Sequence, residues 1–325
     1  MSELFQGIRN GNVSFLARAI TLVESSLPQD RLLANELINL VLPFSGSSFR
    51  LGITGVPGVG KSSFIESFGK LLLANGKKIA VLAVDPSSEK SKGSILGDKT
   101  RMETLSASPH VFIRPTASGG HLGGIARNTF ETILLCEAAG YDFIIVETVG
   151  VGQSETAVQH LTDFFLLLML AGSGDELQGI KRGIMELADA ILITKADGKN
   201  IEPSKVAKAE FSRALHYLPA SESGWIPFTE ICSSNTGLGL DNFLEKLNYY
   251  ETQQKLGGYF KFKRESQSLH WFDDELQSEL NRILLGNPMI SGLIEGYKKE
   301  IISGNISPHA ASATIVSKVL TLLNI

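Results

Sequence analysis

Short apolar runs alternate with amphipathic stretches through the middle of the chain. Seven runs between about residues 49 and 233 have the character of strands, and they read RLGITGV, KIAVLAVD, VFIRP, FIIVETV, FFLLLML, AILITKA and WIPFTEIC. Several are apolar throughout, which is typical of strands that are covered on both faces. The pattern predicts an α/β fold with a doubly wound, mostly parallel sheet, whose ligand binds at the carboxyl ends of the strands.

The two flanks of this region have helical patterns only. We predict an N-terminal helical extension over residues 1–47, a nucleotide-binding domain over residues 48–250 and a C-terminal helical arm over residues 251–325. Glycines and a proline near residues 257–258 and 286–288 should break the arm into separate helices. One face of the arm gathers five apolar residues at helical spacing, namely Leu269, Phe272, Leu276, Leu280 and Leu284. Such an arm is expected to pack on the main domain or on a second subunit.

Composition narrows the class of protein. The 325 residues are 43% apolar and 20% charged, with a net charge of −4, which gives no electrostatic case for nucleic-acid binding. The beginning of the sequence does not resemble a secretory signal, and the longest apolar run, FFLLLMLAG, is too short to span a membrane. We therefore expect a cytoplasmic protein with no membrane partner. Cys136 and Cys232 each lie in an apolar segment and are expected to be reduced core thiols.

A phosphate-binding motif follows the first predicted strand. The sequence GVPGVGKS, from Gly55 to Ser62, fits G-x-x-x-x-G-K-[ST] and lies between a strand and a helical pattern. The glycines let successive backbone N–H groups point at phosphate oxygens, and the following helix adds its positive end. Lys61 can reach the β- and γ-phosphates, and the Ser62 hydroxyl can bind Mg²⁺.

Acidic residues stand at or near the ends of other predicted strands. Glu147 ends a buried strand and Gly150 follows, which suits an acid that holds Mg²⁺ and a flexible N–H for the γ-phosphate. Asp85 suits the orientation of the attacking water, and Asp98 suits a metal-linked loop. On local pattern alone, Glu147 is also compatible with a solvated strand end, and the two aspartates with turn-stabilising roles.

The stretch ILITKADG, residues 191–198, ends a predicted strand in Lys-x-Asp. Guanine presents two adjacent donors that the Asp197 carboxylate can accept, whereas adenine presents an acceptor there. The stem of Lys195 can lie over the base. An Asn is usual at the first position, where it ties this loop to the phosphate loop. Thr194 keeps one hydroxyl there but loses the amide group, which should affect the rigidity of the loop more than the choice of base. The later loop CSSNTG could offer a backbone N–H to guanine O6, although a plain turn fits it equally well.

Together these motifs resemble one known family. GITGVPGVGKSSFIE, AVDPSS, GSILGDKTRM, FIIVETVGVGQSE and GSGDELQGIKRGIMELADAILITKADG are similar to the G-protein chaperones of methylmalonyl-CoA mutase. These MeaB/ArgK-like proteins are also known as lysine/arginine/ornithine transport-system ATPases or kinases. The resemblance implies a P-loop NTPase of the signal-recognition-particle GTPase branch. In that branch Thr-Lys-x-Asp is an accepted form of the base reader, the motif that recognises guanine.

The resemblance also implies an activity and partners. It implies Mg²⁺-dependent GTP hydrolysis that is coupled to the loading and protection of adenosylcobalamin on the mutase, in a homodimer held by the C-terminal arm. It further implies that Gly172 to Glu186 form a switch that communicates with the mutase. Lys181 or Arg182 in that switch could supply the charge of an arginine finger.

The expected site residues divide by role. Those expected at GTP or GDP are Gly55, Val56, Pro57, Gly58, Val59, Gly60, Lys61, Ser62, Ser63, Gly150, Lys195, Asp197, Ser233 and Ser234. Those expected at Mg²⁺ are Ser62, Asp85, Asp98 and Glu147, and those expected in catalysis are Lys61, Asp85, Glu147 and Lys181.

Two other functions use the same motifs. One is a kinase or ATPase that acts on an amino-acid transport system, but the sequence has no evident site that would activate a phosphate acceptor. The other is a nickel metallochaperone GTPase, which the lack of a His-rich tract and of paired cysteines disfavours.

Overall fold

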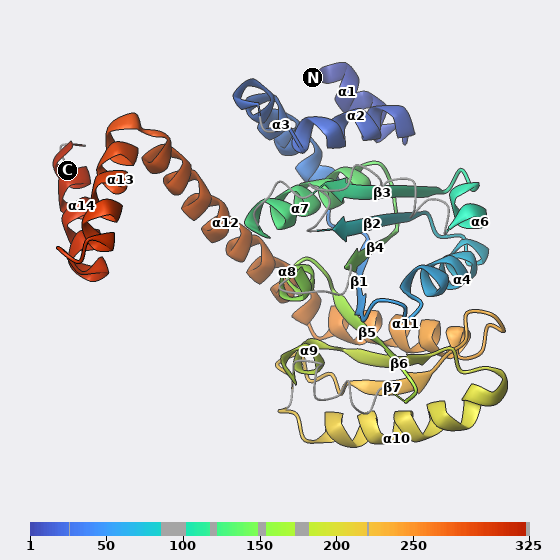
Figure 1. Ribbon diagram of the computed structural model, residues 1–325. Coiled ribbons are helices and arrows are strands. Elements are labelled where there is room, and N and C mark those ends of the chain that lie inside the picture. Colours follow the sequence, from blue (N-terminus) through green and yellow to red (C-terminus); the bar gives the residue numbers. More distant parts are fainter. Residues whose placement is uncertain are drawn as a thin grey trace. The chain divides into compact units, whose positions relative to one another are not determined.

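Parallel strands form the centre of residues 1–267 in a computed structural model (Figure 1). The structure describes residues 1–25, 27–85, 102–117, 122–148, 154–172, 182–219 and 221–322. The strands of this part of the chain are β1 (Phe49–Gly55), β2 (Ile79–Asp85), β3 (Val111–Ala117), β4 (Phe143–Thr148), β5 (Phe164–Leu170), β6 (Ala190–Thr194) and β7 (Phe228–Ile231). They pair in the order β3-β2-β4-β1-β5-β6-β7, and every described pairing is parallel. The predicted doubly wound α/β sheet is confirmed.

Two of the strands are shorter than their apolar runs. The run WIPFTEIC begins at Trp225, but β7 begins only after Pro227, because proline has no N–H to donate to the sheet. The run AILITKA extends to Ala196, but β6 ends at Thr194 because Lys195 has a left-handed backbone with φ 55°. The end of β6 lies at Thr194 and Lys195, which are residues of the expected site.

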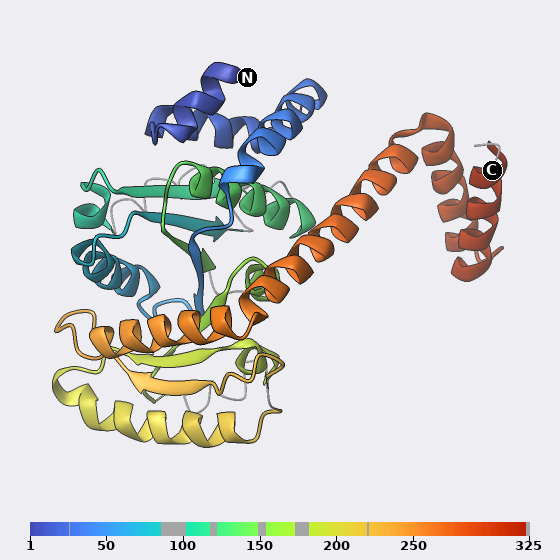
Figure 2. The same ribbon diagram turned by 180° about the vertical axis from the view of Figure 1, so that it is seen from behind.

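Helices cover both faces of the sheet (Figures 1 and 2). One face packs against α4 (Lys61–Ala74), α6 (Glu103–Ser106) and α11 (Leu240–Leu256). The other face is covered by α7 (Leu122–Ala138), α8 (Ser154–Gln159), α9 (Arg182–Leu187) and α10 (Ile201–His216). Phe64 and Phe68 of α4 stack on each other and meet Phe243 of α11. Each such ring contributes about 1.5–3 kcal/mol by burial, so this contact fixes α4 beneath the phosphate loop.

The N-terminal helices lie against the helical layer. They are α1 (Ser2–Arg9), α2 (Val13–Val23), α3 (Pro28–Val41) and the short 3-10 helix η1 (Leu42–Phe44). Asn12 caps α2, since its side-chain oxygen accepts hydrogen bonds from the N–H groups of Ser14 and Phe15. Both α2 and α3 contact α7, so the extension covers the outer side of α7 (Figure 1).

The C-terminal segment is helical, with breaks where the sequence predicts them. Its helices are α12 (Tyr259–Gly286), α13 (Pro288–Ile302) and α14 (Pro308–Leu322). The chain divides into two compact units, residues 1–267 and 268–325, so the first residues of α12 belong to the first unit. The predicted division into three regions stays a prediction.

A buried ion cluster joins three parts of the first unit. The Glu137 carboxylate of α7 accepts bonds from the Arg50 guanidinium at 2.9 and 3.0 Å and from the Ser48 hydroxyl at 2.6 Å. Arg264 of α12 donates to Asp163 at 2.7 and 2.9 Å and lies 3.4 Å from Glu137. The cluster therefore fastens the first turns of α12 to the amino ends of β1 and β5.

Both cysteines are free and buried, as predicted, and burial raises the pKa of the Cys232 thiol to about 12. None of the helices in the described part of the chain is long and apolar enough to cross a membrane.

Candidate functional site

The phosphate-binding loop turns between β1 and α4 through residues that only glycine suits. Gly55 has φ 152°, and a Cβ atom there would lie 2.6 Å from the Leu168 carbonyl oxygen of β5. Gly60 precedes α4 with φ 100°. Val59 between them is fully buried, and its N–H donates to the Val56 oxygen at 3.2 Å. The loop is thus curled and anchored by one apolar side chain, while Pro57 and Gly58 are exposed.

The first turn of α4 brings cationic and hydroxyl groups to this loop. Lys61 is buried, and its Nζ donates to the Gly55 carbonyl oxygen at 2.7 Å and lies 3.4 Å from that of Val56. Ser62 is half-buried and Ser63 is exposed in the same turn. A helix N-terminus that carries a lysine and hydroxyls is suited to bind a phosphate anion.

Acidic positions lie on β4, which pairs with β1, and on β2, which is the next strand after β4. Glu147 is buried near the end of β4, in register with Ile53 of β1 and Ala83 of β2. Asp85 is the last residue of β2, but its side chain lies outside the described residues. The structure therefore brings Glu147 and the backbone of Asp85 to the edge of the sheet that holds the phosphate loop.

Several expected site residues lie outside the described part of the chain. They are Asp98, Gly150 and Lys181, together with residues 173–181 of the expected switch. Arg182 begins α9, but its side chain is outside that part as well. The roles expected for these residues stay predictions.

The expected base reader is tied directly to the phosphate loop. The Thr194 hydroxyl, at the buried end of β6, lies 2.6 Å from the Val59 carbonyl oxygen and 3.2 Å from that of Met169. Lys195 Nζ donates to the Gly58 carbonyl oxygen at 2.8 Å. The stretch Thr-Lys-x-Asp is thus held against GVPGVGKS across more than 130 residues of sequence.

The left-handed backbone of Lys195 has its own support. Asn200, in the 3-10 helix η2 (Gly198–Asn200), donates from Nδ2 to the Lys195 carbonyl oxygen at 2.8 Å. A non-glycine residue with φ above zero is uncommon and is kept by its surroundings. Asn200 therefore helps to hold the turn that places Lys195 over the loop and Asp197 beyond it.

The Asp197 carboxylate is already oriented by a neighbouring loop. Its Oδ2 accepts a hydrogen bond from the Ser233 hydroxyl at 2.5 Å and a longer one from Asn235 Nδ2 at 3.4 Å. The Ser233 hydroxyl in turn accepts from the Thr236 N–H at 3.3 Å. A carboxylate fixed in this way can accept two adjacent N–H donors of a base without a further loss of side-chain freedom.

The same loop carries donors for a base oxygen. Within the described residues, no acceptor is found for the backbone N–H of Ser234 or of Asn235. Guanine O6 is an acceptor, whereas adenine carries a donor at that position. The acceptor Asp197 and these donors together match the pattern of guanine.

Three residues of this site were not predicted from the sequence. Asn200 and Asn235 orient Lys195 and Asp197, and Ser67 of α4 bonds to the Ser234 carbonyl oxygen. Asn235 lies in the Ser/Asn/Gly loop that the sequence did single out. Ser67 had no comparable signal, because it stands in an ordinary amphipathic helix.

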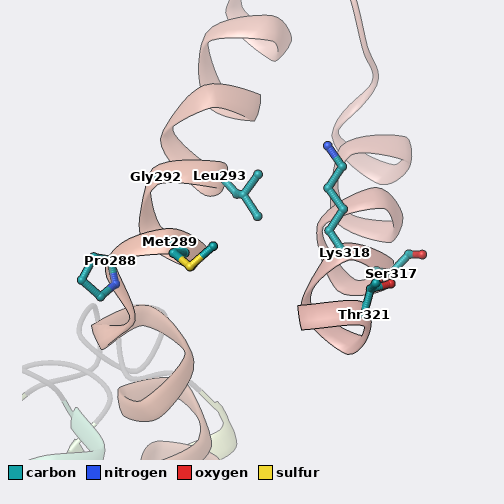
Figure 3. Close-up of a pocket in the computed structure, with 7 residues that line it drawn as sticks. All are labelled: Pro288, Met289, Gly292, Leu293, Ser317, Lys318 and Thr321. Carbon is teal, nitrogen blue, oxygen red and sulfur yellow. The ribbon is translucent and has the colours of Figure 1, made fainter. Parts of the chain in front are cut away.

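A separate hollow of about 650 Å³ lies in the second unit, between α13 and α14 (Figure 3). Met289 and Leu293 extend from α13 toward α14, where Lys318 lines the opposite side. Its lining residues are Pro288, Met289, Gly292, Leu293, Ser317, Lys318 and Thr321. They include none of the expected nucleotide contacts, so this hollow is not the nucleotide site.

Comparison with known proteins gives concordant matches. The family model described as methylmalonyl Co-A mutase-associated GTPase MeaB matches residues 16–288. GTPase ArgK of Escherichia coli strain K12 is 45% identical over 287 residues, which cover 88% of this chain and 87% of that protein. The mitochondrial methylmalonic aciduria type A homolog of Mus musculus is 42% identical over 322 residues, 96% of this chain and 78% of that protein.

A solved structure agrees with the fold. The crystal structure of an LAO/AO transport system kinase is 35% identical, with a TM-score of 0.79, and the match covers 98% of this chain and 97% of that one. The described geometry thus coincides with that of a P-loop GTPase fold.

Proposed function

We propose that this chain, which belongs to the family of methylmalonyl Co-A mutase-associated GTPases called MeaB, hydrolyses GTP and acts as a switch on an adenosylcobalamin-dependent acyl-CoA mutase. Membership of the family confirms the resemblance seen in the sequence motifs. Methylmalonyl-CoA mutase is the first partner that we propose. In this role the protein gates the loading of the cofactor onto the mutase and protects it there.

One observation carries the nucleotide assignment. The base-reading stretch is fastened to the phosphate loop by the Thr194–Val59 and Lys195–Gly58 contacts at 2.6 and 2.8 Å. Asp197 is oriented in the same cluster by Ser233. A phosphate site and an acceptor for the donors of guanine are thereby held in one rigid unit, as recognition of GTP requires.

Lys61 and the N–H groups of the phosphate loop are proposed to act by electrostatic stabilisation of the transferring phosphoryl group. Lys61 Nζ is held by two neutral carbonyl oxygens of the loop. An anionic phosphate oxygen attracts the ammonium charge more strongly than a neutral carbonyl oxygen does. Lys61 should therefore exchange partners when the nucleotide binds, and then stabilise charge on the transferring γ-phosphoryl group together with the loop N–H groups.

The oxygen donors at this edge suit a magnesium ion. The Ser62 hydroxyl and the Glu147 carboxylate are hard ligands of the kind that Mg²⁺ prefers, and we propose that they hold it with Asp85 and Asp98. The ion supplies neutralisation of phosphate charge. Asp85 is proposed to orient the attacking water, and Lys181 or Arg182 to add positive charge.

We further propose that the protein is a homodimer joined through its C-terminal arm. Leu269, Phe272, Leu276 and Leu280 of α12 form an apolar stripe in which each residue is between 47% and 65% exposed. A contiguous apolar stripe on a helix usually marks a surface that another chain covers. The cytoplasmic location expected from the sequence stays a prediction.

The experiment that tests this function has two measurements. Phosphate release from GTP, ATP and XTP by the purified protein should be selective for GTP. Candidate mutases should then co-elute with the protein in a way that depends on whether GDP or a non-hydrolysable GTP analogue is bound. GTP hydrolysis with no mutase bound in either state would leave a GTPase and remove the switch.

The kinase alternative is kept because the related solved structure carries the name of a transport system kinase. The two functions differ in where the phosphate goes. With γ-labelled GTP and candidate periplasmic binding proteins, we expect all label as free phosphate. The kinase would be favoured if a binding protein became labelled and if this labelling required Lys61.

A further inference from the structure

Ser67 links the phosphate-binding helix to the loop beside the base. It lies in α4, six residues after Lys61, and is half-buried. Its hydroxyl donates a hydrogen bond of 2.8 Å to the carbonyl oxygen of Ser234, which is 167 residues away in sequence. A contact of such long sequence separation joins two parts of the site that local structure does not connect.

The ends of the receiving loop are held independently of Ser67. The Cys232 N–H donates to the Ile193 oxygen at 2.8 Å, and the Ala196 N–H donates to the Cys232 oxygen at 3.0 Å. On the other side, the Ser233 N–H donates to the Leu238 oxygen at 3.0 Å. Asn235 and Thr236 bond to Asp197 and Ser233. Ser234 differs, because within the described chain the hydrogen bond from Ser67 is the one that tethers it.

Holding this carbonyl sets the direction of the next N–H. The described chain has no cis peptide bond, and in a trans peptide the carbonyl oxygen and the following N–H point in opposite directions. The bond from Ser67 turns the Ser234 oxygen toward α4, so the Asn235 N–H points away from that helix. Its direction decides whether the loop can donate to a base oxygen.

We propose that Ser67 is a positioning residue for guanine recognition, which fixes the base-contacting loop relative to the phosphate site. The proposal rests on the proposed function and names a determinant of its specificity. Because α4 rises about 1.5 Å per residue, Ser67 lies roughly 9 Å along the helix from Lys61. One rigid helix thereby sets the spacing between the phosphate and base subsites.

This role separates binding of the base from binding of phosphate. Loss of the Ser67 hydroxyl frees the Ser234 carbonyl oxygen, and with it the Ser234–Asn235 peptide, but leaves the start of α4 and its lysine in place. Affinity for nucleotides that present guanine should fall, whereas affinity for bare pyrophosphate should not. Turnover at saturating GTP should change little, since Ser67 contacts no reacting atom.

The test compares Ser67→Ala and Ser67→Thr with the unaltered full-length protein. For Ser67→Ala we expect the Kd for GDP to rise about five- to tenfold, the value of one ordinary hydrogen bond. The Kd for pyrophosphate and kcat at saturating GTP should stay within about twofold, and the preference for GDP over ADP should shrink. Ser67→Thr keeps a hydroxyl and should restore GDP affinity. Lys70→Ala, an exposed change on the same helix, is the matched control.

Two results would overturn the proposal. One is unchanged GDP affinity in Ser67→Ala. The other is an equal loss of affinity for GDP and pyrophosphate, which would indicate a general defect of α4. Failure of the proposed function looks different, because the unaltered protein itself would then not prefer GDP to ADP.

Discussion

At the scale of single residues, Thr194 joins the two halves of the nucleotide site. Its hydroxyl is buried between two carbonyl oxygens, those of Val59 in the phosphate loop and Met169 in β5. A side chain with one hydroxyl thus fastens the base reader to the loop. The contact is short at 2.6 Å, and water has no access to replace it.

Replacing Thr194 by valine keeps the shape of the side chain and removes this bond. The hydroxyl has a single proton, and the buried Val59 carbonyl oxygen at 2.6 Å loses it as a donor, so we expect the free energy of unfolding to fall by about 1–3 kcal/mol. GDP affinity should fall as well. Urea unfolding and GDP titration measure the two effects, with Thr194→Ser as the control that keeps the hydroxyl. Equal behaviour of the two variants would show that the hydroxyl does not matter.

The sequence located the main parts of the site but not their supports. Lys61, Thr194, Lys195 and Asp197 belong to local motifs whose chemistry can be read from neighbouring residues. Ser67 and Asn235 act through bonds to groups that only the fold brings near, which are the Ser234 carbonyl oxygen and the Asp197 carboxylate. Asn200 acts through a local bond to Lys195. No local pattern distinguishes a serine that reaches another loop from one that faces water.

At the scale of elements, the buried ion cluster determines how α12 begins. Burial alone would raise the pKa of Glu137, but Arg50, Arg264 and the Ser48 hydroxyl outweigh it, so that the pKa is lowered. The carboxylate also accepts the Gly46 N–H at 2.6 Å. The charged form is therefore favoured in the folded protein, and α7, β1 and α12 depend on it together.

Because the pKa of Glu137 is lowered on folding, the protein should lose stability as the pH falls. The unfolded chain binds a proton at Glu137 near pH 4.3, whereas the folded protein binds it only at lower pH. The stabilisation is therefore complete above about pH 4.3 and is lost as the pH falls through the folded pKa. At pH 7, Glu137→Gln should cost about 3 kcal/mol, because two arginines lose a buried partner.

The measurement is the unfolding free energy of the unaltered protein and of Glu137→Gln from pH 7 down to pH 3. Their difference should stay constant to about pH 5 and shrink below pH 4.3. Glu265→Gln, an exposed change in α12, should have little effect at any pH. A difference that does not shrink in acid would mean that the Glu137 charge is not what stabilises the junction.

Element boundaries show what a sequence pattern leaves open. All seven apolar runs form strands, since a buried parallel strand needs little more than continuous apolar character. Pro227 and the left-handed Lys195 then shorten two of them, β7 and β6. The proline effect can be read from the sequence, whereas no sequence pattern marks the Asn200 side chain as a donor to the Lys195 carbonyl oxygen.

At the scale of the whole molecule, the exposed stripe on α12 should govern assembly. Leu276 lies near the centre of that stripe and is 47% exposed. We expect Leu276→Glu to convert a dimer into a monomer, because a charge would have to be buried in the interface. Light scattering during gel filtration measures the mass directly.

Ser278→Glu provides the control for this change. Ser278 is nine residues after Leu269 and so stands on the opposite side of α12 at 3.6 residues per turn. It adds the same charge to the same helix and should leave the dimer intact. Equal masses for the two variants would exclude the stripe as the dimer contact.

The central claim is that the protein is a guanine-nucleotide switch whose base is read by Asp197. The most direct test is the ratio of kcat/KM for GTP to that for XTP, in the unaltered protein and in Asp197→Asn. The side-chain amide of an asparagine can donate to the carbonyl oxygen on C2 of xanthine, which stands where guanine carries its amino group. We therefore expect the ratio to favour GTP in the unaltered protein and to reverse by about 100-fold or more in the variant. An unchanged preference in Asp197→Asn would contradict the account.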